Sequence, residues 1–359
     1  MRTPRQKKFD RLYYGLEPWL VARYNDRDIF RTFGFKSMGP AFDAAFRETI
    51  RPYWARYGVR VKKLWYKELY ALTGSTDPRY IPQSLFHEKI LTHFDDPAYV
   101  RQLADKNLHT LLFPGVRRPE TVFKCIGRGY LEDDFRPIPR PEAVARLEQE
   151  GEFVVKPTRD SGQGSDIRFF RGPLPAEERE ALLARYDGVT DYIVQRAVRQ
   201  HPDLARFNRS SLNTMRIVTL VFQDTPYILS SILRIGGPDS RVDNVSKGGW
   251  QCTIRPDGRL EPLAFTCRGG ESLRAEDNGA GLRWGDCVIP GFQRVRETAL
   301  ALALRLPHLR LIGWDFALDE EGEVVLIEFN CQIDQNQATC GPTFGDLTEG
   351  VLAEVFGAP

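Results

Sequence analysis

Two apolar runs near the C-terminus, Leu311–Leu318 and Glu323–Asn330, have the composition and length of paired β-strands. The segment between them, Asp319-Glu320-Glu321-Gly322, is polar and ends in glycine, which is typical of a hairpin turn. A short loop of this kind pairs Leu318 with Glu323. The pattern therefore predicts an antiparallel hairpin whose two strands are largely apolar.

The predicted register fixes the positions of the few polar residues in this hairpin. It sets Asp315 opposite Leu326 and one pleat step from Glu328. Because side chains alternate between the two faces of a strand, Asp315, Glu328 and Asn330 should all point the same way. Converging carboxylate and amide oxygens suit Mg²⁺, which usually bridges to nucleotide phosphates. An ordinary hairpin with a polar outer face is the alternative.

The first third of the chain has mainly helical periodicity. Apolar residues recur there at a four-residue step, which puts them on one helix face: Phe42, Phe46, Ile50 and Trp54. Pro52 should kink or break that helix. Residues 85–112 also look helical, with a break at Asp96-Pro97, and two short pieces, 111–113 and 120–125, look like strands.

From residue 151 onward the pattern changes to strands and turns. Strands are predicted at 151–157, 167–170, 191–198, 213–221 and 227–235, and helices at 142–150, 175–186 and 295–306. A glycine-rich loop at 236–250 is long enough to suggest a function. The mixture predicts an α+β protein.

Composition narrows the class of protein. The 359 residues carry a net charge of +2, and no apolar run is long enough for a transmembrane helix. The basic N-terminus lacks the apolar core of a secretory signal. The six cysteines show no CxxC spacing, which argues against a zinc site or a disulfide framework and leads us to expect a cytoplasmic protein.

The charge is unevenly distributed. Residues 1–70 hold 16 Lys and Arg against 7 Asp and Glu, a balance of +9, so the remainder carries −7. Such a region could meet a membrane surface, a nucleic acid or an anionic substrate, or it could be the solvated face of amphipathic helices. We expect no nucleic-acid partner, because no basic-aromatic strand motif or zinc module is present.

A candidate phosphate site follows the strand at 151–157. Lys156 stands at its end, and the next loop contains Gly162 and Gly164, which allow backbone N–H groups to turn toward a ligand. The lysine would add a positive charge for the same phosphates. In a P-loop the lysine follows the glycines, so this is a different motif. A surface turn explains the pattern equally well when it is taken alone.

The order of these features resembles the ATP-grasp superfamily: a lysine strand, a glycine-rich flap, a linker strand at 191–198, and then Asp315 with Glu328-x-Asn330. The spacing of 13 residues from Asp315 to Glu328 matches the metal motif of that superfamily. The resemblance covers roughly residues 100–345. Segments 65–86, 211–220 and 243–250 are more narrowly similar to the sugar-transfer associated ATP-grasp proteins, which are related to glutamate-ligase-like enzymes.

This resemblance implies a nucleotide-binding role for each matching residue. Lys106, of the pair Asp105-Lys106, would contact the α-phosphate, with Lys124 as a competitor, and Lys156 would be the second nucleotide lysine. The remaining candidates are the flap residues Ser161, Gly162, Gln163, Gly164 and Ser165, the adenine contacts Gln195, Ala197 and Val198, and the ribose contacts His201 or Asp203. One or two Mg²⁺ would be held by Asp315, Glu328 and Asn330.

The resemblance also implies catalytic roles. Arg216 would hold the γ-phosphate or an acyl phosphate, and Asn213 and Lys156 join it as catalytic candidates. A surface arginine on a strand is the alternative for Arg216. Further candidates could close over the phosphates or the second substrate: Asn244, Lys247, Gly248 and Gly249.

The implied fold has two α+β lobes gripping ATP, with a mainly helical N-terminal region. The expected parts are a basic helical region at 1–80, an N-terminal and central lobe at 81–198, and a C-terminal lobe at 199–359. The implied activity is an ATP- and Mg²⁺-dependent carboxylate–amine ligase working through an acyl phosphate. Its small-molecule substrates could be sugar-linked, since the family is associated with polysaccharide pathways.

Two rival functions stay open, as does the oligomeric state. One rival is an ATP-grasp-type kinase that phosphorylates a hydroxyl, and the other is a non-catalytic nucleotide- or glycan-binding protein. Two departures from the superfamily pattern leave the acyl acceptor undetermined. Gly313 stands where several ligases carry arginine, and Cys331-Gln332-Ile333-Asp334 replaces the usual Pro-Gly.

Overall fold

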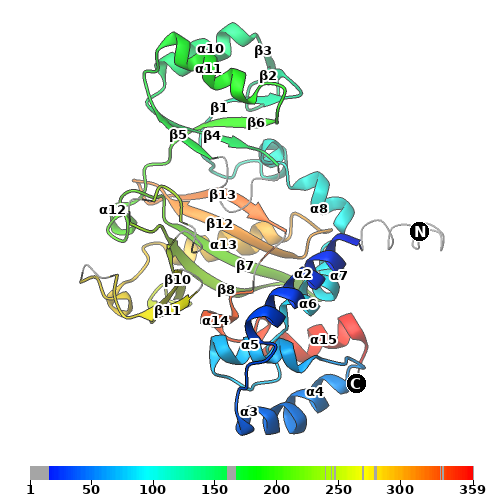
Figure 1. Ribbon diagram of the computed structural model, residues 1–359. Coiled ribbons are helices and arrows are strands. Elements are labelled where there is room, and N and C mark those ends of the chain that lie inside the picture. The colour runs from blue at the N-terminus through cyan, green and yellow to red at the C-terminus, as the bar shows by residue number, and fades with distance from the viewer. Residues whose placement is uncertain are drawn as a thin grey trace, which may run out of the picture.

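The computed structural model describes residues 16–358 apart from 160–166, 239, 244, 246–247, 269–270, 279–280, 332 and 334. A small sheet with two helices stands above a larger sheet, and a helical region packs on the other side of the larger sheet (Figure 1). This arrangement confirms the predicted α+β class and the mainly helical N-terminal region. None of the described helices is long and apolar enough to span a membrane.

The helical region consists of short segments that follow one another through residue 112. They are α2 Leu16–Phe33, α3 Pro40–Ala45, η1 Phe46–Ile50, α4 Arg51–Ala55, α5 Lys63–Thr73, α6 Gln83–Leu85, η2 Phe86–Leu91, α7 Thr92–Phe94, α8 Pro97–Leu103, η3 Lys106–Leu108 and α9 His109–Leu112. Helix α9 corrects the strand expected at 111–113. Pro52 does not interrupt its helix, because the π-helical turn η1 directly precedes it and the chain continues into α4.

The small sheet is antiparallel in every pairing, with the strand order β3-β2-β1-β6-β4-β5. Its strands are β1 Thr121–Ile126, β2 Gly129–Leu131, β3 Pro137–Ile138, β4 Glu152–Pro157, β5 Arg168–Arg171 and β6 Tyr192–Arg196. Helices α10 Arg140–Gln149 and α11 Ala176–Tyr186 cover one face and share a core with it (Figure 1). The other end of the lobe faces the large sheet.

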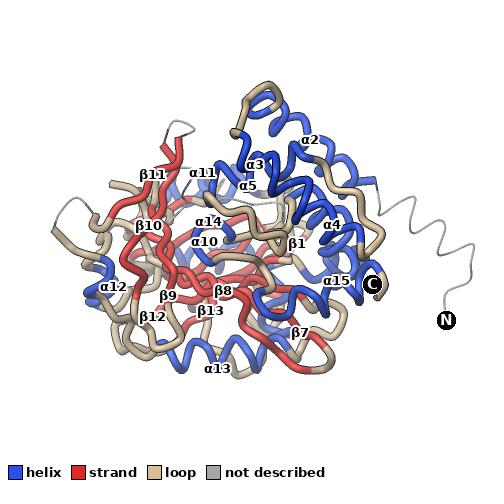
Figure 2. Tube along the Cα trace, turned by 90° about the horizontal axis from the view of Figure 1, so that it is seen from below, coloured by secondary structure: helices blue, strands red, loops and turns tan. Residues whose placement is uncertain are grey.

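The large sheet has the strand order β11-β10-β9-β8-β7-β12-β13. Its strands are β7 Thr214–Phe222, β8 Thr225–Ile235, β9 Trp250–Ile254, β10 Leu260–Arg268, β11 Glu271–Ala275, β12 Leu311–Leu318 and β13 Val324–Asn330. The described parts of the connections contain short helical segments: α12 Pro202–Ala205, η6 Trp284–Asp286, α14 Gln337–Cys340 and η7 Gly345–Leu347. Helix α13 Phe292–Ala303 lies on one face, and the helical region with α15 Thr348–Phe356 lies on the other (Figure 2).

Strand β12 is buried at all eight of its positions, because helices cover both faces of the sheet where it runs. A strand buried on both sides needs apolar residues in succession, which explains the run that begins at Leu311. Asp315 interrupts that run and is therefore a buried charge. Its position in the middle of the sheet requires a partner of opposite charge.

The hairpin itself forms as predicted, but its register differs. Leu318 pairs with Val324, and a β-bulge farther along leaves Asp315 directly opposite Glu328. The turn differs because the Asp319 carboxylate accepts hydrogen bonds from the N–H groups of Glu321 (3.1 Å) and Glu323 (2.9 Å). Asp315 and Glu328 still lie on the same face of the hairpin, as predicted. The pairing of the two strands is shifted by an even number of residues, which leaves each side chain on its face.

Trp54 should be critical for the stability of the helical region. It is fully buried, its indole N–H donates to the carbonyl of Pro78 (3.0 Å), and its ring packs edge-on against Phe356. We expect Trp54→Ala to lower the free energy of unfolding by about 3–5 kcal/mol through the cavity it leaves. Chemical denaturation followed by circular dichroism measures this. Trp19→Ala is the matched control, because Trp19 is exposed, and an equal loss in both variants would contradict the packing described.

Candidate phosphate site between the two sheets

Two lysines from the small-lobe side approach the large sheet at the same place. Lys106 belongs to η3, whose N-cap Asp105 accepts from the Asn107 N–H (2.9 Å). The Lys106 N–H donates to the carbonyl of Thr158 (3.0 Å), directly after β4, and the Lys106 ammonium lies 3.3 Å from a Glu328 oxygen. The capping of η3 and its bond to the end of β4 therefore fix Lys106 over the hairpin.

Lys156 lies on β4 and is buried, although lysines are rarely buried without a functional or pairing reason. Burial lowers the pKa of Lys156 to about 8; the Glu328 carboxylate raises it, and the neighbouring charge of Lys106 lowers it. Lys106, Lys156 and Glu328 thus form one electrostatic group, in which the two lysines come from the small-lobe side and Glu328 from the large sheet.

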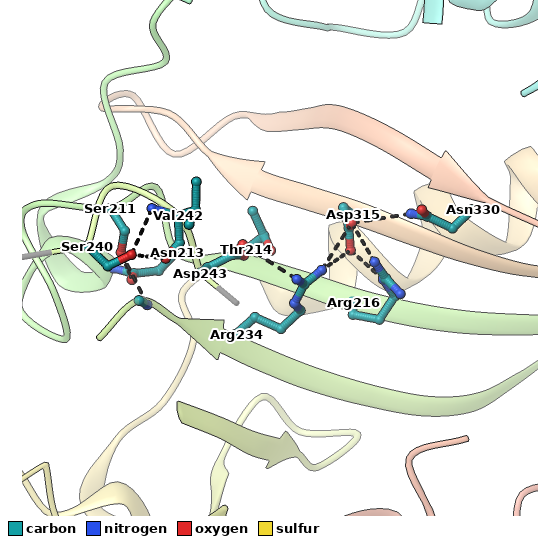
Figure 3. A network of polar contacts seen from close by, with 11 residues as sticks. Ser211, Asn213, Thr214, Arg216, Arg234, Ser240, Val242, Asp243, Asp315 and Asn330 are labelled. Atoms are coloured by element: carbon teal, nitrogen blue, oxygen red, sulfur yellow. Dashed lines mark hydrogen bonds and ion pairs between the residues drawn. The ribbon is translucent and has the colours of Figure 1, made fainter. Parts of the chain in front are cut away.

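The large sheet contributes a buried ion-pair network (Figure 3). Arg216 on β7 lies opposite Asp315 on β12, and its guanidinium binds both carboxylate oxygens, with Nη2 2.7 Å from Oδ2. Arg234 on the next strand, β8, places Nη1 3.3 Å from the same Oδ2, and Asn330 donates to it at 3.3 Å. Two arginines and an amide therefore hold the Asp315 carboxylate. Their side chains come from four consecutive strands of the sheet, β8, β7, β12 and β13.

Asp243 extends this network into the loop after β8. One of its oxygens lies 3.6 Å from Arg234, and the Thr214 hydroxyl donates to the carboxylate. Burial raises the pKa of Asp243, while the charge of Arg234 lowers it. Sequence reasoning missed both Arg234 and Asp243. A signal for Arg234 was present in the sequence, because Arg216 and Arg234 lie on the two strands of one predicted hairpin. The register of that hairpin would have placed them close together.

Two of the predicted residues are engaged elsewhere. The Lys124 ammonium is fully buried and donates to the carbonyls of Asn107 (3.0 Å) and Asp133 (2.7 Å) and to the Thr110 hydroxyl (3.0 Å). These bonds use all three of its N–H groups, so Lys124 supports the backbone beside Lys106 and the structure favours Lys106 as the phosphate lysine.

Asn213 is also committed to the fold. Its side-chain amide donates to the carbonyls of Leu204 (2.8 Å) and Asn208 (2.8 Å) and accepts from the Ser211 hydroxyl (2.9 Å). These bonds order the loop before β7, on the side away from Arg216 (Figure 3). The structure therefore does not bring Asn213 to the charged cluster around Asp315.

The adenine candidates lie toward the opposite end of β4 and β6 from Lys156. Ala197 and Val198 line an open cavity of about 800 Å³ between the small sheet and the tip of the β12–β13 hairpin. Gln195 is buried and donates to the carbonyl of Pro119 (3.2 Å). The ribose candidate Asp203 is exposed on α12 and is not among the residues that line this cavity.

Several predicted residues lie outside the part of the chain that the structure describes. They are the flap residues Ser161, Gly162, Gln163, Gly164 and Ser165, and the loop residues Asn244 and Lys247. Gly248 and Gly249 are described, and the carbonyl of Gly249 accepts from the Thr266 hydroxyl (2.6 Å). The roles assigned to all of these residues stay predictions.

The charges of the cluster indicate what it can bind. Four cations, Lys106, Lys156, Arg216 and Arg234, surround three carboxylates, Asp243, Asp315 and Glu328. One positive charge is in excess within this group of seven side chains. This balance favours an anion with several oxygens, such as a phosphate chain.

The fit to Mg²⁺ differs among the three predicted ligands. The Glu328 side chain is partly exposed, and Asn330 lies two residues farther along the same strand, so both offer suitable oxygens. Asp315 is saturated by Arg216, Arg234 and Asn330 and fits the metal only if it releases one of them. Among the described residues, no group of three or more His, Cys, Asp or Glu side chains could hold a metal by itself.

Comparison with known proteins relates part of the chain to one family. Residues 178–339 match the model of the sugar-transfer associated ATP-grasp family. No curated protein sequence matches the chain significantly.

Similar solved structures include the ATP-grasp ligase PsnB complexed with minimal precursor (14% identity, TM-score 0.40, 73% of this chain and 64% of that one). D-alanyl-alanine synthetase A from Vibrio cholerae is also similar (12% identity, TM-score 0.43, 72% of this chain and 65% of that one). The same holds for the D-cycloserine synthetase DcsG (18% identity, TM-score 0.40, 73% of this chain and 71% of that one). The chain spans slightly less than two thirds of the first two proteins. The match of residues 178–339 to the sugar-transfer associated ATP-grasp family model confirms the resemblance seen in the sequence.

Proposed function

We propose that this protein is an ATP- and Mg²⁺-dependent carboxylate–amine ligase that works through an acyl phosphate. The observation that carries the proposal is the convergence of Lys106 and Lys156 from the small-lobe side with Glu328 and the Arg216–Asp315 pair from the large sheet. A site of this kind neutralises a phosphate chain from two directions. The match of residues 178–339 to an ATP-grasp family model supports ATP as the phosphate donor.

The proposed division of labour follows from the positions of the cations. Lys106 and Lys156 bind the nucleotide phosphates, and the lower exposure of Lys156 strengthens its interaction because less water screens the charge. Arg216 has five N–H groups, of which Asp315 takes two. The remaining donors of Arg216 and those of Arg234 suit the oxygens of the transferring phosphoryl group and of the acid substrate.

The reaction then needs no covalent intermediate on the protein. A substrate carboxylate oxygen attacks the γ-phosphorus of ATP, the bond to the β-phosphate oxygen breaks, and ADP leaves. The amine nitrogen next attacks the carbonyl carbon of the acyl phosphate; inorganic phosphate leaves, the nitrogen loses a proton, and an amide forms. Arg216 and Arg234 stabilise the negative charge that develops on oxygen in both steps.

Glu328 and Asn330 would hold the Mg²⁺ that accompanies the nucleotide, and Asp315 would join them only by giving up a contact with Arg216 or Arg234. When bound, the metal neutralises charge on the phosphate oxygens. The association of the family with sugar transfer makes a sugar-linked acid or amine the first class of substrate to test.

The proposal is tested by ADP release from the purified full chain with Mg²⁺, ATP and panels of uronic acids, amino acids and amines. Hydroxylamine should trap the acyl phosphate as a hydroxamate whenever the correct acid is present. Transfer of phosphate to a sugar hydroxyl, with no hydroxamate, would instead identify a kinase. Tight nucleotide binding without turnover on any pair would favour a binding protein.

Removing the charge of Lys156 should abolish most activity without unfolding the protein. We expect Lys156→Met to lower kcat/KM by about 10²–10³-fold, as for other losses of a preorganised charge. Lys89→Met is the matched control, because Lys89 lies on the surface beside Glu88. Steady-state ADP release measures both, and a loss below about threefold in Lys156→Met would contradict the assigned role.

Nucleotide binding should weaken at alkaline pH. Phosphate binds the protonated form of Lys156, whose pKa in the free protein is about 8, so above that pH binding must take up a proton. The Kd for ADP should therefore rise by up to about tenfold per pH unit above about pH 8.

Lys156→Arg provides the control for this dependence, because a guanidinium stays charged throughout the range. Isothermal titration from about pH 7 to about pH 10 should give a flat profile for that variant. The same slope in the wild type and the variant would assign the dependence to a different group.

A further inference from the structure

The outer face of helix α2 carries an unusual concentration of apolar side chains. Among the described residues, thirteen large hydrophobic side chains are exposed, and seven of them lie within residues 16–35: Leu16, Trp19, Leu20, Val21, Tyr24, Phe30 and Phe35. A single exposed apolar residue needs no explanation, but a contiguous group marks an interaction surface.

The orientation of α2 is fixed by its inner side, so this exposure is built into the fold. Ala22 and Ile29 are buried against the rest of the helical region. Asp26 accepts hydrogen bonds from the Ser84 hydroxyl (2.7 Å) and the Trp65 indole (2.5 Å). The C-terminal end of the helix is tied down by Lys67, which donates to two carbonyls there (3.1 Å each).

Arginines alternate with the apolar residues on the outer face. At 100° per residue, the solvent side opposite Ala22 and Ile29 contains Leu16, Leu20 and Tyr24, flanked by Trp19 and Phe30, with Arg23, Arg27 and Arg31 between them. The Arg23 guanidinium lies 4.8 Å from the centre of the Trp19 ring. Phe30 and Phe35 make an edge-on pair with 5.5 Å between ring centres.

The acidic residues of α2 leave this face positive. Glu17 is paired with Arg101, with 2.6 Å between charged atoms, and Asp26 with Lys62 on the inner side. Asp28 is exposed at the edge of the face, and its single negative charge is outnumbered by the three arginines of the face. The sequence before the helix, residues 1–15, adds five Lys and Arg against one Asp.

We propose that the outer face of α2 binds the surface of an anionic lipid membrane, with the helix axis lying in the plane of the interface. Leu16, Leu20 and Phe30 would enter the boundary of the acyl chains, Trp19 and Tyr24 suit the headgroup level, and the arginines would meet lipid phosphates. This inference goes beyond the proposed ligase activity and does not depend on it.

Two other occupants fit the same face less well. A second copy packed by twofold symmetry would bring Arg23, Arg27 and Arg31 against their own counterparts. A nucleic acid would use the arginines but leave Leu16 and Leu20 against a charged backbone. An anionic lipid surface satisfies the apolar and the cationic residues together.

The test is flotation of the full-length protein with vesicles. We expect binding to vesicles of phosphatidylglycerol and phosphatidylcholine in equal amounts, little binding to phosphatidylcholine alone, and weakening by salt. Leu20→Ser/Tyr24→Ser should lower the partition coefficient by about tenfold or more. Val189→Ser/Leu304→Ser is the matched control, since Leu20 and Leu304 are 52% and 55% exposed.

A second readout follows one residue in the intact protein. Trp19 is the only exposed tryptophan of the six, so quenching of fluorescence by brominated lipid should occur and should disappear in Trp19→Phe. Absence of flotation, an equal loss in both double variants, or quenching that persists in Trp19→Phe would overturn the proposal. A dimer that Leu20→Ser/Tyr24→Ser dissociates, without vesicle binding, would do the same and identify a second copy as the occupant.

Discussion

The buried pair between Arg216 and Asp315 is the interaction on which the centre of the molecule depends. Burial alone raises the pKa of Asp315, but the charges of Arg216 and Arg234 outweigh it and hold that pKa below its ordinary value. Loss of either guanidinium would leave a charge uncompensated inside a sheet that is covered on both faces, which costs several kcal/mol in comparable buried pairs. The contacts of Asp315 with Arg216 and Arg234 therefore hold β7, β8 and β12 in one arrangement. Glu328 lies opposite Asp315 in the β12–β13 hairpin, so its position depends on the same contacts.

The sequence allowed the strands of this hairpin to be predicted, but not the contacts around it. The expected register was wrong at the turn and again at the bulge, and the two errors together preserved the face on which Asp315 and Glu328 lie. Arg234 and Asp243 were missed because their approach to Asp315 depends on pairing between β7 and β8 and on the course of a loop. Contacts between residues this far apart in sequence are not encoded in local periodicity.

The choice between Lys106 and Lys124 shows a second limit of sequence reasoning. Both lysines lie near strand or helix ends with plausible spacing, and spacing alone left the choice open. In the structure the three N–H groups of the Lys124 ammonium all donate hydrogen bonds within the protein, to Asn107, Thr110 and Asp133. A buried polar group must be satisfied where it lies, so its hydrogen-bond partners distinguish a supporting residue from one that is available to a ligand.

The helical region also supports the site, although residue 80 was the expected end of the N-terminal part. The core under the large sheet combines Trp54 and Phe86 with Leu311 of β12, so it draws on both sides of that boundary. Asp95 reaches the same strand directly, because its carboxylate accepts from the Leu311 N–H (2.9 Å). The start of the strand that carries Asp315 is therefore anchored by the helical region. Helix α2 is attached to the same core through Ile29, so its exposed face has a fixed orientation relative to the candidate phosphate site.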